Sequence, residues 1–265
     1  MSPRARVVLF VAVAALAAAG TAVGVTLATR TDVKDQTVEA PPFVPDPTAS
    51  PQIANEVRDA LAAWPAGTVR RLRVLAEQLP RSALVRYELG LALALSGLND
   101  DAVAAWRAAE RVQPDSPSAV RSQDLRFRDT PPGLPPFVPA FADASTAAQR
   151  HLLRGAAFQQ ALRPVSAERE FARAAGLTPN DPEALTAAAV GLYDKDRPAL
   201  AFSKLGPLAR RFPHAQTVRF HLGLMLIYFR DLAEARRELE LALAEGPGTR
   251  LGKRAQQLLK AAAGG

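Results

Sequence analysis

The chain has 265 residues, of which 48% are hydrophobic and 22% charged, and it contains no cysteine. The hydrophobic fraction is large enough for a sizeable core and excludes a wholly disordered chain. The absence of cysteine excludes disulfides, thiolate metal sites, a cysteine nucleophile and a lipid anchor on cysteine. The abundance of alanine and arginine is typical of a bacterial protein.

The first element is an uncharged run over residues 7–29, Val7 to Thr29, preceded by Arg4 and Arg6. It exceeds the roughly 20 residues that cross a bilayer as a helix. A cleavable signal peptide is the alternative, because Ala17 and Ala19 form an A-x-A pattern. The run extends well past the roughly 15 apolar residues of a signal peptide, however, and this favours a retained anchor over residues 1–30. We expect a single-pass membrane protein whose N-terminus is cytoplasmic and whose remainder is extracytoplasmic.

Residues 31–48 are polar, acidic and rich in proline, which is typical of an extended stalk. The stalk contains the pentapeptide Pro-Pro-Phe-Val-Pro at residues 41–45, and the same five residues recur at 135–139.

A period of 34 residues organises the rest of the chain. One row of the repeat is proline, at Pro80, Pro114, Pro179, Pro213 and Pro247. A second row is small, at Thr68, Ala102, Ala167, Ala201 and Ala235, and a third is large, at Leu72, Trp106, Phe171, Leu205 and Leu239. A fourth row is small again, at Gly90, Gly155, Ala189 and Gly223. Small residues on the first helix that face small residues on the second allow two antiparallel helices to pack closely, and the large residue fills the neighbouring hole.

These rows resemble the tetratricopeptide repeat family, as a membrane-anchored bacterial member. The resemblance implies an all-α fold, in which antiparallel helix pairs stack into a right-handed superhelix behind the N-terminal transmembrane helix. It covers a degenerate capping unit at 49–82, where Glu56 replaces the usual small residue, and units at 83–116, 148–181, 182–215 and 216–249. Residues 250–265 are predicted to form a basic, amphipathic capping helix.

An insertion at residues 117–147 interrupts the repeat and contains the second Pro-Pro-Phe-Val-Pro. Two interpretations remain open. In the first, both pentapeptides are extended segments that cover helix surfaces with their Phe and Val side chains. In the second, one of them lies in the concave groove as a built-in peptide. Polyproline-like segments suit such docking because they lose little entropy.

No pattern indicates an enzyme. The histidines, at His151, His214 and His221, lack metal-ligand spacing, and no phosphate-binding loop or nucleophile motif is present. We expect no cofactor and no metal. The formal net charge is +7, but the basic residues are scattered except in the C-terminal helix, so no nucleic-acid partner is expected. That helix is predicted to be a solvated cap, with contact to anionic lipid as the alternative.

The resemblance implies a ligand in the concave groove, which the first helix of each repeat lines. Aromatic residues dominate binding hot spots. The candidate partner-binding residues are Tyr87, Leu91, Gln159, Gln160, Thr186, Tyr193, Phe220, Leu224 and Tyr228. The sequence therefore predicts a membrane-tethered protein–protein interaction module that holds a peptide or helix of a partner. A self-associating structural component of a cell-envelope complex is the alternative.

Overall fold

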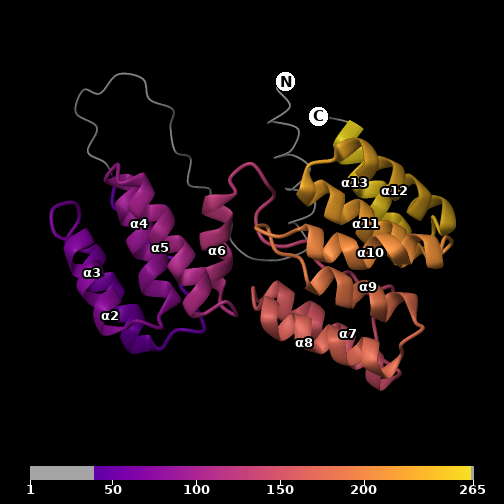
Figure 1. The fold of residues 1–265 in the computed structure, drawn as a ribbon, viewed down its shortest axis with the longest axis horizontal. Helices are drawn as coiled ribbons and strands as arrows, with labels where there is room; N and C mark the ends of the chain where they lie inside the picture. The colour runs from indigo at the N-terminus through magenta and orange to yellow at the C-terminus, as the bar shows by residue number, and fades with distance from the viewer. Residues whose placement is uncertain (1–38, 264–265) are drawn as a thin grey trace.

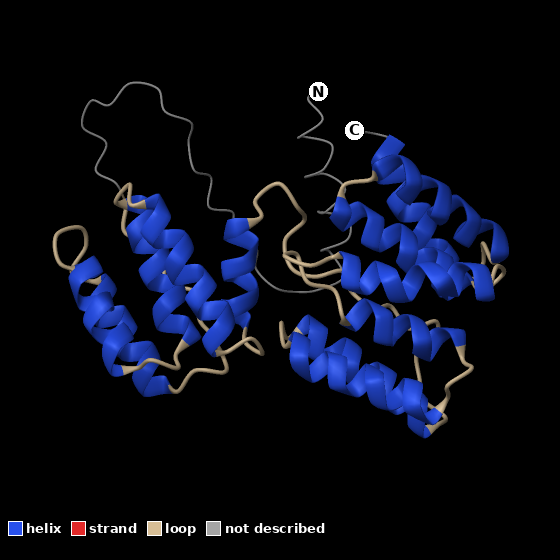
Figure 2. Cartoon of the chain, viewed as in Figure 1, coloured by secondary structure: helices blue, strands red, loops and turns tan. Residues whose placement is uncertain are grey.

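The computed structural model describes residues 39–263, which form twelve helices and, within that range, no strand (Figure 2). The helices of the N-terminal part are α2 (Pro51–Leu61), α3 (Thr68–Gln78), α4 (Ala83–Leu95), α5 (Asn99–Val112) and α6 (Pro117–Arg126). Those of the C-terminal part are α7 (Ala147–Gln160), α8 (Pro164–Leu177), α9 (Pro182–Gly191), α10 (Ala199–Arg211), α11 (Gln216–Phe229), α12 (Leu232–Glu245) and α13 (Arg250–Ala263). Consecutive helices pack in pairs, which confirms the all-α prediction and is consistent with a helical repeat.

The predicted membrane segment at residues 7–29 lies outside the described residues. From residue 39 to residue 263, no helix combines the length and the apolar character that a bilayer crossing requires.

Several helices begin behind a residue whose side chain caps the first turn. The side chains of Ser50, Ser82 and Ser116 accept hydrogen bonds from backbone amides of the first turns of α2, α4 and α6. Thr146 forms a full capping box with Gln149 at the start of α7. Such caps satisfy amides that have no partner within the helix.

The fourth row of the repeat packs directly against the third. A Cβ atom added at Gly90 would lie 2.3 Å from Trp106, and one added at Gly155 would lie 2.3 Å from Phe171. Both large side chains are buried. Each glycine therefore leaves the space that the large residue of its helix partner fills, and this explains the close pairing of α4 with α5 and of α7 with α8.

The helices form two lobes, which Figure 1 shows side by side. The first lobe comprises residues 39–126 and the second comprises residues 131–263. Each lobe has its own hydrophobic cluster, and within the described residues no helix of one lobe packs on a helix of the other. The repeat predicted one continuous superhelix, but the helical stacking is interrupted after α6.

Two elements differ from the sequence prediction. The insertion at 117–147 opens with a helix, α6, which starts at Pro117 behind the cap Ser116 and packs on α4 and α5. Its low hydrophobic periodicity hid it from the sequence analysis. In addition, α9 ends at Gly191, so Tyr193 lies in the following turn rather than on the helix as the repeat predicted. The predicted C-terminal helix is confirmed as α13, with Leu251 and Leu258 buried.

Candidate partner-binding groove

The second Pro-Pro-Phe-Val-Pro segment lies across the first helices of three successive repeats. The Phe137 amide donates to Gln159 of α7 over 2.7 Å, and the Val138 amide donates to His221 of α11 over 2.9 Å. Just beyond the pentapeptide, the Ala140 amide donates to Glu183 of α9 over 2.6 Å. We call residues 131–141 the strap. Its backbone is held by side chains of α7, α9 and α11, the first helices of three predicted repeat units.

The ring of Phe137 is buried in an aromatic slot. It stacks on His221, with ring centroids 4.8 Å apart and an angle of 18° between the planes, and meets Phe171 edge-on at 5.3 Å. Phe137 is only 3% exposed and belongs to the hydrophobic core of the second lobe. The strap is therefore part of the packed structure and anchors itself through one aromatic side chain.

The contacts of His221 determine its tautomer. Nδ1 lies 2.7 Å from the carbonyl oxygen of Thr217, which only accepts, so Nδ1 carries the proton. Nε2 faces the Val138 amide, which only donates, so Nε2 is unprotonated. Complete burial lowers the pKa of His221 to about 4, because desolvation penalises the charged ring. The ring is thus a neutral hydrogen-bond acceptor for the strap.

The first Pro-Pro-Phe-Val-Pro segment docks on the first lobe in a related way. The Val44 amide donates to Oε1 of Glu88 on α4 over 3.0 Å, and Arg121 of α6 donates to the Pro45 carbonyl over 2.8 Å. The Phe43 ring is half-buried beneath the Arg58 guanidinium, whose Cζ lies 4.4 Å from the centroid of the ring. In both copies the valine amide is therefore accepted by a side chain of a repeat helix.

Glu88 is fully buried, and its Oε2 has no hydrogen-bond partner among the described residues. Burial raises its pKa to about 8, although the Val44 amide and Arg121 oppose the shift. The side chain therefore holds a proton at neutral pH.

A cavity of about 350 Å³ lies beside the strap. Its floor is apolar, from Ala156, Phe220, Leu224 and Leu258, and Gln160 lies at its edge. The strap closes one side and α13 the other, where the lining includes Arg250, Lys253 and Arg254. No carboxylate is among the lining residues of this cavity. The groove of the second lobe thus keeps open space next to its own segment.

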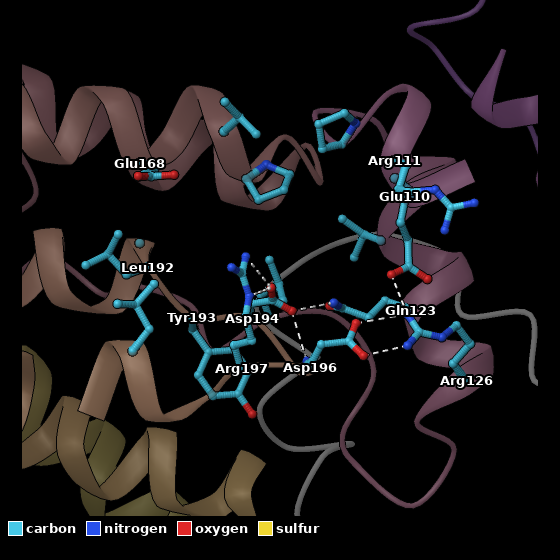
Figure 3. Close-up of a pocket in the computed structure, with 18 of the residues that line it drawn as sticks. Glu110, Arg111, Gln123, Arg126, Glu168, Leu192, Tyr193, Asp194, Asp196 and Arg197 are labelled. Atoms are coloured by element: carbon cyan, nitrogen blue, oxygen red, sulfur yellow. Dashed lines mark hydrogen bonds and ion pairs between the residues drawn. The ribbon is translucent and has the colours of Figure 1, made fainter. Parts of the chain in front are cut away.

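A larger cleft, of about 610 Å³, lies between the two lobes. Figure 3 shows Arg126 of α6 reaching both Glu110 and Asp196, and Gln123 reaching Asp194. The Arg126–Asp196 contact is bidentate, at 2.5 and 2.9 Å. The charges of this cleft largely neutralise one another, which is typical of a polar junction between lobes.

The start of the strap is fastened at the same junction. The buried Lys195 ammonium contacts Asp124 of α6 at 2.6 Å and donates to the Pro131 carbonyl over 2.7 Å. Asp124 also accepts from the Gly133 amide. These contacts join the first lobe, the strap and the second lobe.

The predicted partner-binding residues divide between the lobes. Gln159 holds the strap directly, through the Phe137 amide and the Pro135 carbonyl. The Tyr228 hydroxyl lies 3.5 Å from the Pro132 carbonyl, and its ring meets Tyr193 edge-on. Three further predicted residues of the second lobe, Gln160, Phe220 and Leu224, line the cavity beside the strap.

The other three predicted residues are buried in the core. Tyr87 and Leu91 are buried in the first lobe on α4. Thr186 is fully buried within α9, and its hydroxyl has no hydrogen-bond partner among residues 39–263.

The sequence analysis did not predict Glu88, Glu183 or His221 as acceptors for the proline-rich segments. The missed signal was the register of the repeat, because Glu88 and His221 are both the sixth residue of their units, 83–116 and 216–249. A carboxyl in the middle of the mostly apolar α4 was the second signal. Within residues 39–263 no group of three or more potential ligand side chains is positioned to hold a metal ion.

Comparison with protein-family models and with curated proteins finds no match to this chain.

Proposed function

We propose that this protein is a membrane-tethered tetratricopeptide-repeat protein that acts as an adaptor, scaffold or assembly factor. In this proposal the groove of the second lobe binds a peptide or helix of a partner protein. One observation carries it: side chains of α7, α9 and α11 already hold an extended segment by its backbone amides. A surface that binds backbone amides and buries one aromatic ring has the chemistry of peptide recognition.

Site-specific crosslinking tests the groove. The chain has no cysteine, so a single introduced cysteine can carry a photo-crosslinker at one position only. Gln160→Cys places it at the edge of the cavity, and Glu240→Cys places it on the exposed outer face of α12. We expect a discrete crosslinked protein from position 160 and none from position 240. Equal labelling from both positions, or none from either, would contradict the proposal.

The membrane placement is part of the same proposal. Residues 7–29 serve as the anchor, and the repeat lobes lie outside the cytoplasm. Arg250, Lys253 and Lys260 are exposed on α13 and are suited to contact anionic lipid. Protease protection of a C-terminal tag in cells with an opened outer barrier tests the topology. Digestion of the tag, with a cytoplasmic control intact, is the expected result, and a protected tag would move the partner search into the cytoplasm.

Self-association is the second candidate function, and exposed apolar residues favour it. Phe229 at the end of α11 is 55% exposed and lies edge-on to Phe202 of α10, while Leu200 is 43% exposed. Isologous contacts commonly use such patches. Sedimentation of the full chain in detergent tests this function, because a monomer at all concentrations would exclude it.

A further inference from the structure

The two copies of Pro-Pro-Phe-Val-Pro are held at equivalent positions of the repeat. The valine amide of each copy donates to the sixth residue of a repeat unit, which is Glu88 in the first lobe and His221 in the second. An arginine of the helix that closes each lobe donates to a carbonyl at or just beyond the copy, Arg121 of α6 to Pro45 and Arg250 of α13 to Phe141. The chain thus contains two instances of one recognition event.

The hydrogen-bonding capacity of the second copy matches its groove. Proline has no amide hydrogen, so a Pro-Pro-Phe-Val-Pro segment has two backbone donors, those of Phe137 and Val138. Both find side-chain acceptors, in Gln159 and His221. The prolines also limit the segment to extended conformations, which lowers the entropy lost on docking.

The side chains of the segment explain the choice of its central residues. The slot between His221 and Phe171 accepts a flat ring and buries it almost completely. Val138 is partly buried at the edge of the core. A segment with an aromatic residue followed by a β-branched residue, flanked by prolines, satisfies every contact that the groove makes to residues 135–139.

We propose that the partner carries a segment of this same chemistry, Pro-Pro-aromatic-β-branched-Pro, and that it enters the groove of the second lobe by displacing the strap. This inference rests on the proposed function and names its ligand class. The cavity beside the strap provides room for the residues that flank the incoming segment. The three cations of its rim, Arg250, Lys253 and Arg254, and the absence of a lining carboxylate favour an acidic flank.

Displacement depends on competition with an occupant that is covalently attached. A segment on a short linker has an effective concentration of about 1 mM, and Lys195 and Arg250 fasten the strap on both sides of its centre. A free peptide therefore binds the wild-type protein weakly. Replacing Phe137 weakens the binding of the strap, and it leaves Gln159, His221 and Phe171 of the groove in place for the peptide.

The test uses the full chain in detergent and a fluorescent peptide with the sequence of residues 131–141. We expect the peptide to bind the Phe137→Ala variant at least tenfold more tightly than wild type. A control peptide with alanine in place of the phenylalanine that corresponds to Phe137 should bind the variant at least tenfold more weakly. The matched protein control, Phe43→Ala, disables only the first copy and should leave the affinity of the second lobe unchanged.

A milder variant, Phe137→Leu, keeps the test valid if Phe137→Ala does not fold, as judged by its helical circular dichroism. Peptide binding to neither variant, while at least one of them is folded, would overturn the inference. Equal binding of the two peptides would do the same.

A second copy of the chain is the other occupant that the test distinguishes. If Phe137→Ala sediments as a dimer, and the dimer is lost in Phe43→Ala/Phe137→Ala, residues 41–45 of another copy fill the groove and the inference is wrong. Crosslinking from position 160 separates this failure from that of the proposed function. A trapped partner that lacks such a segment would retain the function and exclude the ligand class.

Discussion

The amide of Val138 donates to Nε2 of His221 over 2.9 Å, although the two residues are 83 positions apart in the chain. This contact joins the insertion to the fifth repeat unit and requires a neutral imidazole. A proton on Nε2 would place two donors face to face. The attachment of the strap is therefore coupled to the protonation state of one buried ring.

Acid should weaken this attachment. The pKa of His221 is about 4 in the folded protein, compared with the ordinary value of 6.5 that applies to the unfolded chain. As the pH falls, the unfolded chain therefore binds the proton first. Stability from this group is present above pH 6.5 and is lost between pH 6.5 and 4, by at most about 3 kcal/mol. His221→Gln should flatten this part of the profile in urea unfolding. Identical slopes for the wild type and His221→Gln would contradict the assignment.

The buried Glu88 should have the opposite pH dependence. Its folded pKa is about 8, above the ordinary 4.5, so its contribution is complete below pH 4.5 and is lost as the pH rises toward 8. Glu88→Gln keeps an oxygen acceptor for the Val44 amide and cannot ionise. The free energy of unfolding of this variant, relative to wild type, should increase by about 2 kcal/mol or more between pH 5 and pH 8. A difference that stays constant over this range would show that Glu88 is not buried as a proton-holding group.

Gly155 should tolerate no side chain. Alanine there would place Cβ 2.3 Å from the ring of the buried Phe171, and overpacking of this kind costs about 1–3 kcal/mol. The matched control is Gly176→Ala in α8, where a Cβ meets nothing within 4 Å. That change should stabilise the helix by about 0.5–1 kcal/mol. Thermal unfolding would separate the two variants, and a stable Gly155→Ala protein would contradict the packing of the second lobe.

The lobe junction should depend on Arg126. Its guanidinium is 8% exposed and pairs with Glu110 and Asp196, and burial already raises the pKa of Glu110. Arg126→Ala removes the partner of both carboxylates and should cost about 3 kcal/mol. The control, Arg73→Ala, breaks an ion pair between Arg73 and Asp101, and both of these side chains are more than half exposed. Its loss should cost less than about 1 kcal/mol. Urea unfolding of the two variants measures the difference, and equal losses would argue against a buried junction.

The sequence by itself determined most of the helices and how the helices within a repeat unit pair. Caps such as Ser50, Ser82 and Thr146 act on their own first turns, so local chemistry places the helix starts. The match of Gly90 with Trp106 and of Gly155 with Phe171 joins residues only 16 positions apart, and the 34-residue period exposes it. The same period placed Gln159 among the candidate groove residues, but its contacts with the strap were found only in the structure.

Only the tertiary structure decided where the two proline-rich copies lie, that α6 closes a separate first lobe, and that Thr186 is completely buried. The physical reason is the distance along the chain. Val44 meets Glu88 across 44 residues and Val138 meets His221 across 83, and both acceptors depend on how whole repeats stack. A repeat pattern specifies contacts within and between adjacent units, whereas the path of an irregular segment is set by the acceptors and the aromatic slot that the assembled lobes present to it.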